Sequence, residues 1–204
     1  MPRIIGLTGN IACGKTSVGH MLLALGAERY IDADAIVHNL YECGEPIAEQ
    51  VAEAFGSSVM ARDGSVDRKA LGAVVFHDED ALKRLERIVH PAVGKALISE
   101  IAQVSPSGIA ILDAVKLIEG NSGAFCQSKW LVVCPEEQEL SRLMERNALS
   151  EQEAWARIRA QTPVSDKLPF VDEVIDNGGS LEETRQQVEN AYVRFCGQFP
   201  ASTI

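Results

Sequence analysis

The sequence has no long hydrophobic run, and no uninterrupted apolar stretch among its 204 residues approaches the length that a membrane span needs. No apolar signal region precedes the first strand expected near the N-terminus. Internal repeats and disordered segments are not indicated either. We therefore expect a cytoplasmic protein that has no membrane partner.

Cysteines are few and do not form a pattern. The five that occur are Cys13, Cys43, Cys126, Cys134 and Cys196. Their number is odd, and the C-x-x-C spacing of zinc and redox sites is absent. The pattern excludes a disulfide framework and predicts reduced thiols.

Positive charge is also scarce, since 19 lysines and arginines face 29 aspartates and glutamates, for a net charge of −10. Affinity for a phosphate backbone needs clustered cations, so we expect no nucleic-acid partner and a small substrate instead. The basic residues that do cluster lie late in the chain, on two expected helices. They are Arg142, Arg146, Arg157 and Arg159.

Short apolar segments alternate with helical patterns along the whole chain, which predicts an α/β fold with a parallel five-stranded sheet flanked by helices. The expected strands are 3–8, 29–32, 109–113, 130–134 and 173–176. We expect a single domain. Its expected parts are a core (1–45, 104–138 and 169–204), a helical substrate-binding lobe (46–103) and a helical lid (139–168).

The most specific motif follows the first expected strand and precedes an amphipathic helix. It fits G-x-x-x-x-G-K-S/T without a mismatch, and this strand–loop–helix order is typical of nucleoside triphosphate binding. The expected nucleotide-binding residues are Gly9, Asn10, Ile11, Ala12, Cys13, Gly14, Lys15, Thr16 and Ser17.

Each motif position has a chemical reason. The glycines let successive backbone N–H groups point at phosphate oxygens, at the positive end of the next helix. Lys15 is expected to reach the β- and γ-phosphates, and the Thr16 hydroxyl to bind Mg²⁺. The thiol of Cys13, beside Lys15 at a helix N-terminus, is expected to have a lowered pKa.

Carboxylates follow the second expected strand, where ligands of such sheets bind. A phosphoryl-transfer enzyme needs a carboxylate that orients the acceptor hydroxyl and accepts its proton. Asp34 is the first choice for this general base, with Asp32 beside it as an acceptor-binding residue. Aspartate is also a favoured N-cap, so the alternative role for either residue is to cap the helix that begins near Ala35.

Two further polar residues end expected strands. Asp113 follows an apolar run and is placed to hold Mg²⁺, directly or through water. Asn177 lies in the turn after the fifth strand and is a candidate adenine contact, although the pattern also fits an ordinary turn.

The clustered arginines fit a lid that excludes water and neutralises charge on the moving phosphoryl group. A capping box formed by Ser150 and Glu153 predicts that the second lid helix starts there and runs to about Gln161. Arg146 is the best lid candidate, and Arg142 a nucleotide contact. A solvated helix face remains the alternative.

Several motifs together resemble the dephospho-coenzyme A kinase family, and the resemblance extends from Arg3 to about Phe195. They are Gly6-Leu7-Thr8-Gly9, Ile31-Asp32-Ala33-Asp34, Arg62-Asp63-Gly64 with Arg68, Val89-His90-Pro91 and Val174-Ile175-Asp176-Asn177-Gly178. The resemblance implies a P-loop kinase fold and transfer of the γ-phosphate of ATP to the ribose 3′-hydroxyl of dephospho-coenzyme A.

Site roles follow from the same resemblance. It implies that Asp34 is the base, Lys15 the phosphate clamp and Arg146 the lid arginine, with Asn177 near the adenine. Arg68 and His90 then belong to the acceptor lobe. His90 precedes a proline, and that step is expected to end a helix, so the alternative role of His90 is to fix the turn of the chain there.

The chain departs from the family after the third strand, where Lys116 replaces an apolar residue. We expect Lys116 to contact an acceptor phosphate or to pair with an aspartate. A nucleoside monophosphate kinase, a nucleotide-dependent switch or hydrolase, and a silent coenzyme A sensor remain alternatives. The cofactors expected are ATP and Mg²⁺, and the protein is expected to be a monomer or weak homo-oligomer.

Overall fold

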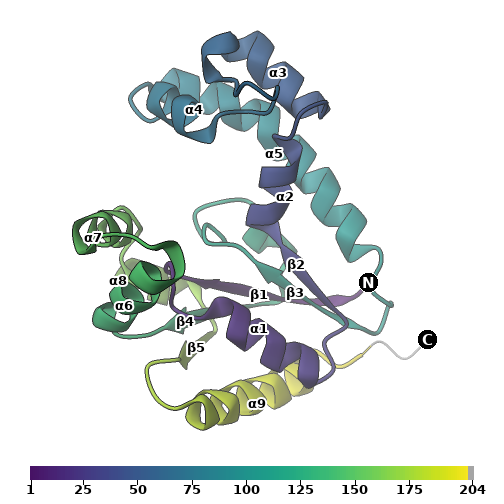
Figure 1. Cartoon of the computed structure of the whole chain (residues 1–204). Coiled ribbons are helices and arrows are strands. Elements are labelled where there is room, and N and C mark those ends of the chain that lie inside the picture. Colours follow the sequence, from purple (N-terminus) through teal and green to yellow (C-terminus); the bar gives the residue numbers. More distant parts are fainter. Residues whose placement is uncertain (202–204) are drawn as a thin grey trace. The chain divides into compact units, whose positions relative to one another are not determined.

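A computed structural model describes residues 1–201 (Figure 1). The chain forms two compact units, a core unit made of Met1–Ile31 and Ile101–Ile204 and a helical unit made of Asp32–Glu100. Within residues 1–201, no helix combines the length and the hydrophobicity needed to cross a membrane. The boundary at Asp32 places the first helix after the second strand in the helical unit.

The centre of the core unit is a five-stranded parallel sheet, as the sequence predicts. Its order is β2-β3-β1-β4-β5, so β1 lies between β3 and β4. The strands are β1 (Arg3–Gly9), β2 (Arg29–Asp32), β3 (Ile109–Asp113), β4 (Ser128–Val133) and β5 (Glu173–Asp176). Parallel pairing brings the carboxyl ends of β1, β3 and β4 to one edge of the sheet.

β4 begins at Ser128, two residues before the expected start. The apolar pattern missed these first two residues because both are polar. Ser128 is nevertheless buried, and its hydroxyl accepts a hydrogen bond from the Trp130 indole N–H at 2.9 Å. The Lys129 backbone N–H donates to the Asp172 carboxylate at 2.7 Å. These partners satisfy polar groups that an apolar pattern does not reveal.

Helices complete the core unit, and some of them bury apolar side chains against the sheet. Those of the core unit are α1 (Lys15–Ala24), α6 (Glu136–Asn147), α7 (Glu151–Arg159), α8 (Val164–Lys167) and α9 (Leu181–Gln198). α1 and α9 lie side by side (Figure 1). Leu22 of α1 and Val188 of α9 are fully buried against the strand residues Leu7 and Trp130.

The helical unit has its own apolar core. It contains α2 (Ala33–Leu40), α3 (Pro46–Phe55), α4 (Arg68–Val75) and most of α5 (Glu79–Ile101). Val51 and Val59 are fully buried in it, and Leu71 and Val89 are nearly so. A separate core of this kind allows the unit to hold its own shape.

The expectation that a helix ends at His90 is wrong, because α5 continues through Pro91 to Ile101. A proline inside a helix removes one backbone hydrogen bond and costs about 3 kcal/mol. Burial of Val89 before the proline and of Leu97 after it opposes that cost. Tertiary packing therefore outweighs the local preference.

Candidate functional site

The phosphate-binding loop joins β1 to α1, as the motif predicts. β1 ends at Gly9 and α1 begins at Lys15. Gly14, the N-cap, has φ 100°, and Ala12 has φ 62°. The left-handed region costs a non-glycine residue roughly 1–2 kcal/mol, so the fold around Ala12 holds the loop in a shape that its sequence does not prefer.

The glycines at both ends of the loop are required by close packing as well as by φ. A Cβ on Gly9 would collide with the Val132 carbonyl oxygen, and one on Gly14 would collide with the Asn177 side-chain amide. Neither backbone oxygen nor buried amide can move away easily. Both motif glycines are therefore fixed by their neighbours on β4 and after β5.

The start of α1 is left open for an anion. No side chain caps this helix, and its first turn contains no acidic residue. The Lys15 ammonium donates to the Gly9 carbonyl at 3.2 Å, and Thr16 and Ser17 are exposed. A helix N-terminus without a side-chain cap, the helix dipole and a lysine at one place suit an anion such as phosphate.

The expectation that Cys13 has a lowered thiol pKa is wrong. Its side chain is fully buried, and burial raises the thiol pKa to about 11, more than Lys15 lowers it. Removing a thiolate from water costs more free energy than the attraction of a nearby cation restores. Cys13 therefore packs the underside of the loop as an apolar side chain.

Two side chains that the sequence analysis assigns to the nucleotide hold the loop backbone in this structure. The Asn177 amide donates to the Cys13 carbonyl at 2.8 Å, and its own Oδ1 accepts from Thr184 at 3.2 Å. Arg142 donates to the Cys13 carbonyl at 3.5 Å and to the Asn177 carbonyl at 3.2 Å. Both are part of the support of the loop from β5 and α6.

The segment after α7 supports the loop too, and sequence reasoning missed it. Gln161 accepts a hydrogen bond from the Ile11 backbone N–H at 2.7 Å. Lys167 donates to the Asn10 side-chain oxygen at 3.2 Å. The Lys167 side chain is 2% exposed, although lysines are almost never buried unless they are paired. No local pattern distinguishes it from a surface lysine.

A second residue missed by sequence reasoning is Glu139 on α6, a buried carboxylic acid. Its Oε2 atom has no hydrogen-bond partner among residues 1–201. Burial raises the pKa of Glu139 to about 7, and the like charge of Glu136 adds to this. The positive charges of Lys15, Lys167 and Arg142 oppose the rise.

Asp113 lies at the carboxyl end of β3, in register with Leu7 of β1. It is 6% exposed, and the Tyr30 hydroxyl donates a hydrogen bond to its Oδ2. Sequence reasoning did not single out Tyr30, whose ring also packs against Gly19 of α1. A buried carboxylate at this edge of the sheet has an oxygen-donor chemistry suited to Mg²⁺.

Within residues 1–201, no group of three or more histidine, cysteine, aspartate or glutamate side chains is placed to hold a metal ion. Mg²⁺ in kinases is held by one or two protein oxygens together with waters and substrate phosphates. Thr16 is an exposed hydroxyl at the start of α1, and Asp113 is a buried carboxylate at the end of β3.

Asp32 and Asp34 have different local roles. Asp32 is the N-cap of α2, and its Oδ1 accepts from the Ala35 backbone N–H at 2.8 Å. Asp34 lies in the first turn of the same helix and is exposed. Asp32 is therefore the capping residue of the pair, and both side chains are exposed.

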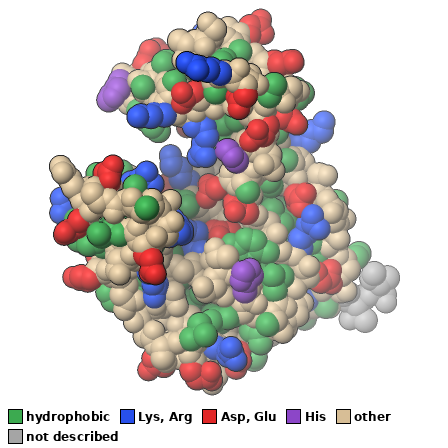
Figure 2. All heavy atoms as spheres, in the orientation of Figure 1, with side chains coloured by type: hydrophobic (Ala, Val, Ile, Leu, Met, Phe, Trp, Pro, Cys, Tyr) green, Lys and Arg blue, Asp and Glu red, His purple; other side chains and the backbone are tan. Residues whose placement is uncertain are grey.

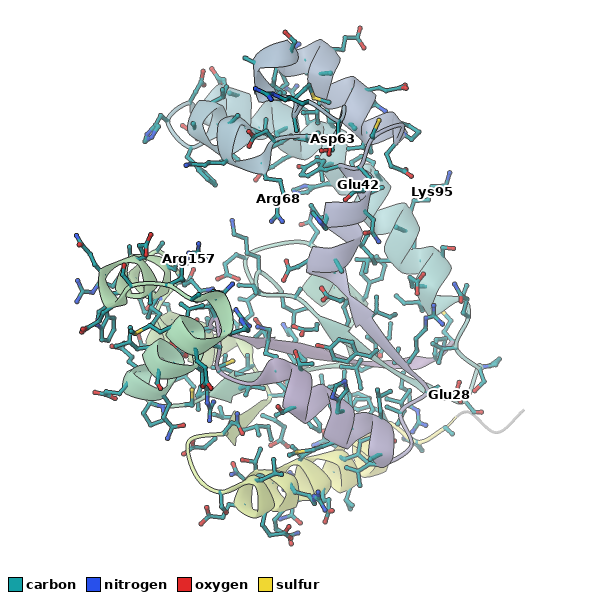
Figure 3. All side chains as sticks on the ribbon, viewed as in Figure 1. Glu28, Glu42, Asp63, Arg68, Lys95 and Arg157 are labelled. Atoms are coloured by element: carbon teal, nitrogen blue, oxygen red, sulfur yellow. The ribbon has the colours of Figure 1, made fainter. Side chains whose placement is uncertain are left out.

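The remaining predicted site residues are at the surface of their units. In the helical unit, Arg68 begins α4 (Figure 3). Burial raises the pKa of Tyr41, and the positive charge of Arg68 opposes this rise. His90 is exposed on α5. In the core unit, Lys116 is exposed after β3. Arg146, in the last turn of α6, donates to the Asn147 side chain at 2.9 Å.

The α6–α7 pair packs directly on the loop. Leu143, Ala154 and Ile158 form a buried cluster, and Ile11 and Ala12 pack against it. The capping box of Ser150 and Glu153 is present as expected, but α7 ends at Arg159. Arg157 lies on α7 (Figure 3), and Figure 2 shows acidic and basic side chains interspersed on the face drawn.

Comparisons with known proteins give one consistent family. The dephospho-CoA kinase family model matches residues 3–183. A dephospho-CoA kinase of Carboxydothermus hydrogenoformans is 43% identical over 187 residues, covering 91% of this chain and 90% of the relative. One of Symbiobacterium thermophilum is 44% identical over 197 residues, covering 96% and 82%.

Solved structures agree with the sequences. The dephospho-CoA kinase of Campylobacter jejuni matches with a TM-score of 0.65 and 26% identity, covering 98% of this chain and all of its own. Shikimate kinase of Bacteroides thetaiotaomicron shares the P-loop kinase fold, with a TM-score of 0.52 and 12% identity. The match covers 95% of this chain and 98% of the shikimate kinase chain. The alternative of a nucleoside monophosphate kinase is not favoured. The chain belongs to the dephospho-CoA kinase family.

Proposed function

We propose that this protein transfers the γ-phosphate of ATP to the ribose 3′-hydroxyl of dephospho-coenzyme A, which completes coenzyme A. The observation that carries the proposal is the open phosphate site at the start of α1, with Lys15 beside it, in a chain of this family. The identity of the acceptor is inferred from the family, and the ATP site is inferred from the phosphate-binding loop.

In this proposal Asp34 is the general base. It orients the acceptor hydroxyl and takes its proton as the new bond to phosphorus forms. Lys15 and the loop amides hold the β- and γ-phosphates in line, and Arg146 neutralises the charge that spreads over the transferred group. The capping of α2 by Asp32 supports this division, because it fixes the turn that carries Asp34.

Thr16 and Asp113 would hold Mg²⁺, which when bound neutralises phosphate charge and orients the triphosphate. Tyr30 holds the Asp113 carboxylate in one orientation through its hydrogen bond. Asp113 ends β3 at the same edge of the sheet at which β1 leads into the phosphate-binding loop. These side chains provide the oxygen donors without a preformed metal cage.

Residues 46–103 serve as the acceptor-binding lobe in this proposal, with Arg68 and His90 as acceptor contacts, and residues 139–168 as the lid. Arg142 and Asn177 act on the nucleotide through the Cys13 carbonyl that they hold. The protein works in the cytoplasm as a monomer or weak homo-oligomer, without nucleic acid.

The test measures ATP consumption with Mg²⁺ and dephospho-coenzyme A, AMP, CMP or no acceptor. Stimulation by dephospho-coenzyme A alone is expected. Asp34→Asn should lower turnover by about 10²–10⁴-fold, the usual contribution of a general base. Asp80→Asn, which changes an exposed aspartate of α5, should retain full turnover.

Stimulation by AMP or CMP would transfer the assignment to a nucleoside monophosphate kinase and leave the fold unaffected. An Asp34→Asn protein that keeps wild-type turnover would remove Asp34 from the chemistry. Circular dichroism of both variants checks that any loss comes from the site rather than from unfolding.

A further inference from the structure

The segment that follows α7 reaches the phosphate-binding loop with two side chains six residues apart. Gln161 accepts from the Ile11 backbone N–H at 2.7 Å, and Lys167 donates to the Asn10 side chain at 3.2 Å. Asn10 and Ile11 are the first residues of the loop after β1. The entry to the loop is therefore held from the end of the α6–α7 hairpin.

These contacts act on a part of the loop that the helix does not control. The residues from Gly14 onward are fixed by α1, and the Cys13 carbonyl is held by Asn177 and Arg142. Asn10 and Ile11 have no regular secondary structure of their own. They directly precede Ala12, which has the left-handed φ of 62°.

Lys167 is a costly residue to bury, which argues for a role beyond filling space. Its ammonium lies 3.8 Å from the Glu119 carboxylate, the ion pair that offsets part of the desolvation. Burial nevertheless lowers the Lys167 pKa, against the effect of Glu119. A methionine or leucine would fill the same space without this cost.

We propose that Lys167 and Gln161 are positioning residues for ATP: they fix the entry of the phosphate-binding loop and link it to the end of the lid. This inference rests on the proposed kinase function and adds two residues that act through the loop. When the lid segment moves, Gln161 and Lys167 move the start of the loop with it. Phosphate alignment then depends on the hairpin as well as on α1.

The test uses Lys167→Met and Gln161→Leu, which keep the size of the side chain. Each should raise the KM for ATP and the dissociation constant of ADP about tenfold, as expected for a lost charged or backbone hydrogen bond. The KM for dephospho-coenzyme A should stay within about twofold, since neither residue is proposed to touch the acceptor. Lys167→Arg keeps the charge on a larger, planar group in a buried place, so it should recover only part of the ATP affinity.

Matched controls change the same residue types at exposed positions. Lys95→Met alters α5, where Lys95 is exposed (Figure 3), and Gln152→Leu alters the first turn of α7. Both should bind ADP as the wild type does. A double variant, Lys167→Met with Asn10→Ala, should lose no more ADP affinity than Lys167→Met alone, because both changes break one contact.

Calorimetric titration with ADP on the folded variants needs no acceptor and no turnover, so its result does not depend on the acceptor assignment. Wild-type ADP affinity in folded Lys167→Met and Gln161→Leu would overturn the proposal. Equal increases in the KM for ATP and for dephospho-coenzyme A would do so too, because they indicate a general structural role.

Discussion

Replacing Glu139 by glutamine should change the pH dependence of stability in a defined direction. Glu139 is 2% exposed on α6, and its Oε2 has no hydrogen-bond partner within residues 1–201. Burial raises its pKa from 4.5 to about 7 in the folded protein. Glutamine has nearly the same shape and carries no charge at any pH.

The sign follows from proton binding in the two states. Below pH 4.5 the residue is protonated in both folded and unfolded chains, and its titration costs no stability. As pH rises through 7, the unfolded chain has already lost the proton and the folded chain must lose it too, so stability falls. At about 1.4 kcal/mol per pKa unit, the full penalty is roughly 3 kcal/mol above pH 8.

Urea unfolding at about pH 5 and about pH 8.5 measures this effect. The stability advantage of Glu139→Gln over the wild type should grow by roughly 2.5 kcal/mol between the two, because the other groups titrate alike in both proteins. Glu137→Gln, an exposed change on the same helix, should show no such growth. An advantage for Glu139→Gln that stays constant or shrinks as pH rises would refute the reasoning.

Two more experiments test the site. Iodoacetamide at pH 8, followed by peptide mass spectrometry, should modify the exposed Cys43 and leave Cys13 largely unmodified, because Cys13 is buried and its pKa is about 11. Rapid labelling of native Cys13 would contradict its burial. Lys116→Leu should raise the KM for dephospho-coenzyme A about tenfold and leave the KM for ATP unchanged if Lys116 binds an acceptor phosphate. Unchanged acceptor kinetics would reject that role.

Local rules explain which parts of the structure could be predicted from the sequence. The glycines, lysine and threonine of the loop follow from phosphate geometry, and the capping box at Ser150 from backbone N–H groups that need partners. The five strands follow from apolar periodicity. These features depend on residues that are close in the sequence, so a local sequence pattern is enough to predict them.

The features that sequence reasoning missed depend on distant neighbours. Lys167 and Asn10 are 157 positions apart, and nothing beside either residue indicates their contact. The rise in the Cys13 pKa depends on how deeply the loop is packed, which outweighs the adjacent Lys15. Pro91 stays helical because residues on both sides of it are buried. Such properties come from the assembled core.

The central place of β1 has a consequence for the order in which the protein is made. Ile5 pairs with Ile111 on one side and Ser128 on the other, so its partners are synthesised about a hundred residues later. The side chains that hold the phosphate-binding loop, Gln161, Lys167 and Asn177, follow later still. On the ribosome, the loop therefore emerges before the side chains that hold it from β5, α6 and the segment after α7, and a nascent chain gains a complete ATP site only after Asn177 has emerged.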